Sequence, residues 1–171
     1  MTEPVLSRET AVLLDYLGGQ RRHVLGILDG LDDAALRRAV LPSGWSCLGL
    51  VHHLTVDVER FWVGAVVAGD PEAIAELDRI ADDGWKVPEG ASTEDVLAGY
   101  RGQCARSDDV VRSADLDASP AWWPTELFGD AHVDDVREVL LHVIAETACH
   151  AGHLDAVREV LDGRQWMVLT D

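Results

Sequence analysis

The chain has 171 residues, of which 47% are apolar, enough for one domain with a sizeable hydrophobic core. Its 31 acidic and 14 basic residues give a net charge of −17, which argues against binding nucleic acid or an anionic membrane through a broad basic surface. No uncharged apolar run reaches the roughly 18 residues of a transmembrane helix, and the first residues lack the features of a signal peptide. We therefore expect a soluble cytoplasmic protein with no nucleic-acid or membrane partner.

The first half of the chain predicts two long amphipathic helices. One spans about residues 7–29, with Ser7 as its N-cap, and a short helical turn at residues 32–38 follows it. The other spans about residues 46–68, with Ser46 as its N-cap. Each has apolar residues at helical spacing, so each should bury one face.

The second half predicts two more long helices and a connecting one. The expected elements are a short helix at 71–81, a loop at 82–91, a helix at 92–113, a loop at 115–132 and a helix at 133–163. The last helix has about 30 residues and should be on the order of 45 Å long. We therefore predict an all-α four-helix bundle that forms a single domain over residues 1–171, with a connection between the second and third long helices that crosses over the bundle end.

Ionisable side chains interrupt the apolar face of the last predicted helix. The apolar positions of this face are Val139, Val143, Leu154, Val157 and Leu161. At about 100° per residue, Glu146 lies in their midst, with His150 and His142 about 40° to either side and His153 about 20° away. Because burying an unpaired charge is costly, several such groups on one core-facing stripe indicate a shared partner, and a metal ion satisfies them together.

A third ligand is expected from the second long helix, which contains His52 and His53. His53 lies on the apolar side and His52 points roughly 100° back, so we prefer His53. The set His53, Glu146 and His150 leaves positions open for water or substrate, as catalytic sites do and Cys-rich structural zinc sites do not. Imidazole and carboxylate ligands suit one divalent ion, with zinc favoured and nickel or iron as alternatives.

The spacing of these residues excludes several known sites. HExxH, the motif of one class of zinc proteases, is absent, and the ExxH pairs of di-iron bundles are replaced by one ExxxH. The plain alternative is that Glu146 and His150 form an ordinary i,i+4 pair without a metal.

Four neighbouring residues are secondary candidates with two interpretations each. His142 and His153 either orient the ligands by hydrogen bonds or lie at solvated ends of the bundle. Asp57 either orients the histidine one turn before it or faces water. Arg60 is a candidate for binding an anionic substrate, with a surface salt bridge as the simpler interpretation.

The cysteines and tryptophans give weaker signals. Cys47, Cys104 and Cys149 form no CxxC pair, so we expect free thiols. Cys149 points about 100° away from His150, which favours a small buried filler over a ligand. The pair at 122–123 lies in a predicted loop, where it either packs or covers a pocket.

Two segments of the chain, GWS…LVHHL…VERFW and LLHVIAETACHAGHLDAVRE, resemble the DinB-like superfamily, which includes the metal-binding domain of mycothiol-dependent maleylpyruvate isomerase. The second segment is similar to an actinobacterial branch with the run ETxRHAGHxDxxRE, and the resemblance covers nearly the whole chain. It implies a four-helix bundle, often homodimeric, with one divalent ion held by His53, Glu146 and His150. Cys149 stands where that branch commonly has Arg, so no role of that Arg is carried over.

The resemblance also implies metal-activated thiol transfer, with mycothiol or a similar low-molecular-weight thiol attacking a small electrophilic substrate. The isomerase has a further domain that helps to hold its substrate, whereas this chain ends soon after its last predicted helix, so we expect a substrate other than maleylpyruvate. Two alternatives stay open. One is a metal-dependent hydrolase, in which the same site activates water, and the other is a non-catalytic metal- or ligand-binding bundle.

Overall fold

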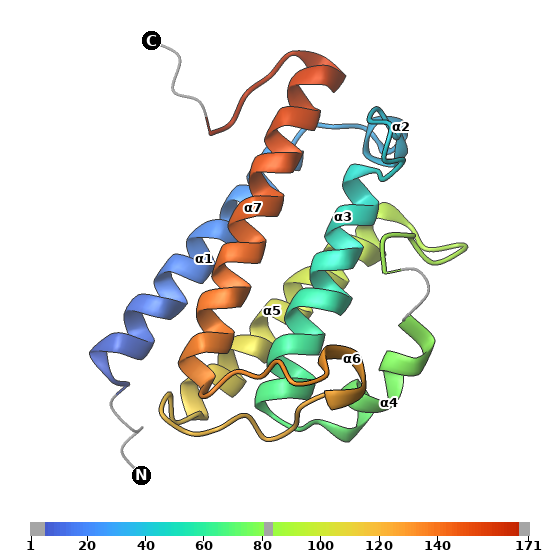
Figure 1. Ribbon diagram of the computed structural model, residues 1–171. Coiled ribbons are helices and arrows are strands. Elements are labelled where there is room, and N and C mark those ends of the chain that lie inside the picture. Colours follow the sequence, from blue (N-terminus) through green and yellow to red (C-terminus); the bar gives the residue numbers. More distant parts are fainter. Residues whose placement is uncertain (1–5, 81–83, 168–171) are drawn as a thin grey trace.

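Four long helical segments form a bundle in the computed structural model, which describes residues 6–80 and 84–167 (Figure 1). They are α1 (Arg8–Leu28), α3 (Cys47–His53) continued by η1 (Leu54–Val67), α5 (Thr93–Ser113) and α7 (Val136–Asp162). In Figure 1, α1 and α7 run in one direction, and α3 with η1 and α5 run in the other. Every element in the described residues is a helix, which confirms the predicted all-α bundle.

Three short helices connect the long ones. They are α2 (Asp33–Arg37), α4 (Pro71–Ile80) and α6 (Thr125–Phe128). Because η1 and α5 are neighbours that run in the same direction, the chain has to return along the bundle between the end of η1 and the start of α5, as a crossover connection does (Figure 1). The sequence did not predict α6, which lies inside the expected loop at 115–132. None of the described helices is both long and apolar enough to cross a membrane.

Three of the long helices begin with a serine cap, and two of these caps, Ser7 and Ser46, were predicted. Ser7, Ser46 and Ser92 each accept a hydrogen bond from the backbone N–H three residues on, so each satisfies one free donor of its helix. The last helix begins three residues later than predicted because the Asp135 carboxylate takes the capping position. It continues unbroken through Gly152 and is the longest of the α-helices, as expected.

The second long helix changes its hydrogen-bonding pattern halfway along. α3 is an α-helix, but η1 is a π-helix, in which each N–H bonds the carbonyl five residues back. The Ala68 N–H, for example, donates to the Val63 carbonyl at 3.1 Å. Since η1 packs against α4, α5 and α7, its apolar residues are buried on several sides, and their spacing did not reveal the wider turn.

A buried ion pair links three of the long helices. Arg21 of α1 is 6% exposed and Glu59 of η1 is 0% exposed. The Arg21 Nε and Nη2 groups donate to the two Glu59 carboxylate oxygens, each at 2.7 Å, and Nη1 donates to Asp108 of α5 at 2.5 Å. This bidentate geometry compensates the buried carboxylate and fixes how α1, η1 and α5 meet.

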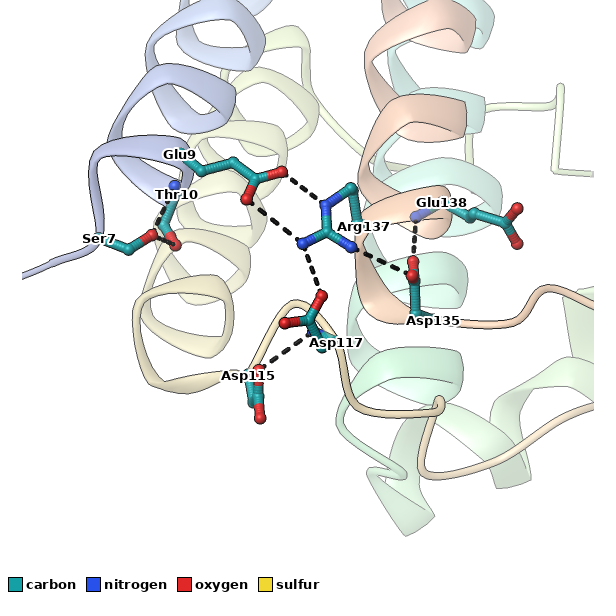
Figure 2. Close-up of polar contacts among 8 residues, drawn as sticks. All are labelled: Ser7, Glu9, Thr10, Asp115, Asp117, Asp135, Arg137 and Glu138. Atoms are coloured by element: carbon teal, nitrogen blue, oxygen red, sulfur yellow. Dashed lines mark hydrogen bonds and ion pairs between the residues drawn. The ribbon is translucent and has the colours of Figure 1, made fainter.

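A second arginine, Arg137, links carboxylates at the end of the bundle where α1 and α7 begin. Figure 2 shows the Arg137 guanidinium among three carboxylates, Glu9 at 2.5 Å, Asp117 at 2.7 Å and Asp135 at 3.1 Å. Asp135 also caps α7, so one residue serves both the helix end and the cluster. The cluster is partly exposed and stabilises less per contact than the buried pair.

We expect Arg21→Met to lower the free energy of unfolding by about 3–5 kcal/mol, because the substitution leaves Glu59 buried without its counter-charge. Arg112→Met is the matched control, since Arg112 forms only partly exposed ion pairs with Asp108 and Asp109 and should cost about 0–1 kcal/mol. Urea unfolding followed by far-UV circular dichroism measures both. Equal losses of unfolding free energy for the two variants would show that the buried ion pair contributes no more to stability than the exposed ones.

Candidate metal centre

The three predicted ligands lie together where α3 and η1 pack against α7. The imidazole rings of His53 and His150 meet edge to face, with their centroids 5.0 Å apart and their planes at 80°. The Glu146 Oε2 atom lies 3.4 Å from the His150 Nε2 atom. His150 is buried, whereas the Glu146 side chain is 39% exposed, so one side of the group is open to solvent.

Each imidazole is oriented by a further polar group. The His53 Nδ1–H group donates to the Asp57 Oδ2 atom at 2.7 Å, which leaves Nε2 as the nitrogen with a lone pair for a ligand. On α7, the Nδ1 atoms of His150 and His153 are 3.4 Å apart. A carboxylate on the far nitrogen of a histidine is the usual support of a metal ligand. Asp57 and His153 thus each contact a predicted ligand, and their role in orienting it stays a prediction.

The spacing of the group can be compared with that of a tetrahedral ion. Two ligand atoms each about 2.1 Å from zinc lie about 3.4 Å apart, and two imidazole rings bound to the same ion have centroids about 5 Å apart. The separations at Glu146–His150 and at His53–His150 are 3.4 Å and 5.0 Å. Among residues 6–80 and 84–167, however, no group of three or more His, Cys, Asp or Glu side chains is placed so that it could hold a metal ion. The two separations match those expected around a divalent ion, but binding one would require these side chains to move.

The electrostatics favour a neutral imidazole at His150. Burial lowers the pKa of His150 below its ordinary value, and the neighbouring His53 ring lowers it further, while Glu146 acts in the opposite direction. A histidine must be unprotonated to donate a lone pair, so this environment suits a ligand.

An aromatic wall borders the two histidines. The Trp85 indole stacks on the face of His53, with centroids 4.0 Å apart and planes at 14°, and its ring lies 5.4 Å from that of His150. Trp45 lies 6.2 Å from Trp85 and 6.4 Å from His153. Trp85 lies inside the predicted loop at 82–91, where no periodic pattern relates it to His53, and only the tertiary fold brings the two rings together.

Two of the secondary candidates lie elsewhere. The His142 ring packs on Trp62, with centroids 4.4 Å apart, so its contact is aromatic. The Arg60 Nε group donates to Glu76 of α4 at 2.5 Å, which is the salt bridge that was its simpler interpretation. Trp123 lies 5.3 Å from Phe128 and 6.0 Å from Trp62, so it belongs to the aromatic cluster at α6.

Cys47 and Cys104 are poor candidates for a nucleophile or a ligand. Burial raises the pKa of Cys47 to about 11, and burial together with the Glu59 carboxylate raises that of Cys104 to about 12. Both thiols therefore stay protonated at neutral pH. Cys149 is exposed, so its prediction as a buried filler is wrong: the α7 face next to His150 at this position points to solvent.

These observations define a helical bundle that presents two imidazoles and a carboxylate between antiparallel helices. A comparison with models of protein families matches residues 12–163 to mycothiol S-transferase. The chain belongs to this family, and the match spans every residue of the candidate centre. It fits the resemblance to the DinB-like superfamily, while the actinobacterial branch stays a prediction. None of the curated proteins compared with the chain matches it.

We expect the purified protein to bind one equivalent of Co²⁺ or Zn²⁺, and His150→Ala to weaken this binding by more than about 100-fold. Loss of a supporting group around a metal typically costs 10–100-fold, so loss of a ligand should exceed that range. Titration with Co²⁺, followed by visible absorption, measures the affinity.

The matched control is His142→Ala, which removes an imidazole from the same helix at a position that packs on Trp62. It should keep the affinity of the wild type within about twofold. Equal affinities for both variants and the wild type would reject the ligand set.

Proposed function

We propose that the protein is a divalent-metal-dependent thiol S-transferase that uses mycothiol or a related low-molecular-weight thiol on a small electrophile. The observation that carries the proposal is the convergence of His53, Glu146 and His150 from two antiparallel helices, in a chain of the mycothiol S-transferase family. Zinc is the favoured ion, with nickel or iron as alternatives.

In this proposal the chain's own residues hold and orient rather than exchange protons. His53, Glu146 and His150 are the ligands, Asp57 fixes the tautomer of His53, and His153 supports His150. A divalent ion held there supplies Lewis acidity, which lowers the pKa of a coordinating thiol. The partial exposure of Glu146 provides the side from which small molecules approach.

The nucleophile in this proposal comes from outside the protein. Cys47 is buried, Cys104 is half-buried and both have raised pKa values, so neither is suited to attack a substrate. The external thiol loses its proton to solvent, its sulfur forms a bond to the electrophilic carbon, and the leaving group departs with the electron pair of the broken bond. A cytoplasmic location, as predicted from the sequence, gives access to such thiols.

We also propose a homodimer. Large apolar side chains are exposed on α1 and near the last described residues, where Tyr16 is 63% exposed and Trp166 is 50% exposed. Exposed apolar surface of this kind favours association in an acidic protein whose charges otherwise keep copies apart.

Metal-loaded protein should transfer mycothiol to 1-chloro-2,4-dinitrobenzene, with the coloured thioether as the readout. His53→Ala should lower the rate at least about 100-fold, because it removes a ligand, and His142→Ala should leave it within about twofold. The same assay without thiol tests water as the nucleophile. Comparable hydrolysis of an ester or amide without thiol would favour the hydrolase, and a bound ion without either activity would favour the binding bundle.

Light scattering should give a mass of twice the 18.6 kDa of one chain. Tyr16→Asp should raise the dimer dissociation constant at least about tenfold by placing a like charge in the contact. Leu127→Asp is the control, since Leu127 is also 63% exposed but lies on α6. A monomer mass across a wide concentration range would reject the homodimer.

A further inference from the structure

The backbone at Gly84 and Trp85 packs closely against α3 and η1, beside the candidate centre. The Gly84 carbonyl accepts a hydrogen bond from the His52 Nδ1–H group at 2.9 Å. A Cβ atom at Gly49 would overlap the Trp85 carbonyl oxygen, so the absence of a side chain at Gly49 is what lets this backbone approach. His52, which is not a predicted ligand, therefore anchors this segment to α3.

Gly84 also leaves room for the Asp57 carboxylate that accepts a hydrogen bond from His53. A Cβ atom at Gly84 would overlap the Asp57 Oδ2 atom, which is the same oxygen that accepts the His53 Nδ1–H group. An alanine at this position must displace either the carboxylate or the segment. The contact between Asp57 and His53 thus depends on a glycine 27 positions further along the chain.

Trp85 restricts the ring of His53 without covering its ligand atom. The indole lies parallel to the imidazole at 4.0 Å, so it occupies the face of the ring, whereas a metal binds a nitrogen in the ring plane. The same indole meets His150 at 71°, with centroids 5.4 Å apart, and so contacts candidate ligands from two different helices. Offset stacking and edge-to-face contacts of this kind favour particular ring orientations.

We propose that Gly84 and Trp85 form a positioning clamp that sets the orientation and tautomer of His53 relative to His150 before the ion binds. The proposal rests on the proposed metal site and adds residues to it that neither bind the ion nor touch the reacting atoms. Asp57 fixes the imidazole through its edge, Trp85 fixes it through its face, and Gly84 allows both contacts at once.

The test measures Co²⁺ affinity and the His53 ring itself. Trp85→Leu and Gly84→Ala should each raise the Co²⁺ dissociation constant about 10–100-fold, the range expected when the support of a ligand is lost. Trp123→Leu and Gly99→Ala are the controls, because Trp123 packs at α6 and a Cβ atom at Gly99 meets open space. Both controls should stay within about twofold of the wild type.

Nuclear magnetic resonance of the metal-free protein gives a readout that does not depend on the ion. In the wild type, the Trp85 ring current should shift the His53 ring protons upfield, and the Nδ1-protonated tautomer should dominate. Trp85→Leu should remove the shift, Gly84→Ala should change the tautomer ratio, and Trp85→Phe should restore both the shift and most of the affinity. Circular dichroism checks that each variant is folded.

The outcomes separate this proposal from the proposed function. A wild type that binds Co²⁺ while Trp85→Leu and Gly84→Ala bind equally well overturns the clamp alone. A wild type that binds no divalent ion overturns both. Unshifted His53 protons in the wild type overturn the clamp whatever the affinities are, because the stack is then absent in solution.

Discussion

The cost of burying charge is the constraint on which this bundle depends, and the protein meets it in two different ways. The Arg21–Glu59 pair is closed: both carboxylate oxygens of Glu59 and three nitrogens of Arg21 have partners at 2.5–2.7 Å. Such a cluster needs nothing from outside and serves to fix the packing of three helices. The group around His53 and His150 is compensated only in part, since its imidazoles have one supported nitrogen each and face a half-exposed carboxylate. In the function we propose, a bound ion completes the second group, whereas the first needs no ligand.

Much of the fold could be predicted because helices repeat their pattern locally. Serine caps and apolar spacing gave the starts of α1, α3 and α5 within a residue or two, and the unbroken stripe gave α7 despite Gly152. The π-helical segment could not be predicted, because η1 packs against several helices and the spacing of its apolar residues does not distinguish a π-turn from an α-turn. The short helix α6 also lacked a signal, since its four residues are too few for any periodicity.

The site was predictable to the extent that it lies on the faces of long helices. The positions of ionisable groups on apolar stripes predicted that His53, Glu146 and His150 form one group, and the structure brings these residues close together. Trp85 was not found, since its contact with His53 spans 32 positions and depends on the absence of side chains at Gly49 and Gly84. When a contact with another segment is what requires a glycine, the pattern of neighbouring residues in the sequence does not reveal it. Arg60 shows the opposite case, because its angular position was compatible with the site but α4 supplies Glu76 as its partner.

The two charge clusters are joined through η1, and this connection relates the stability of the bundle to its candidate site. Asp57 and Glu59 are two positions apart on η1, so their side chains leave the helix on roughly opposite sides. Glu59 is held by Arg21 from α1, while Asp57 reaches back to His53. The buried ion pair and the candidate site therefore share one helix, because the carboxylate that Arg21 holds lies two positions from the carboxylate that accepts the His53 Nδ1–H group.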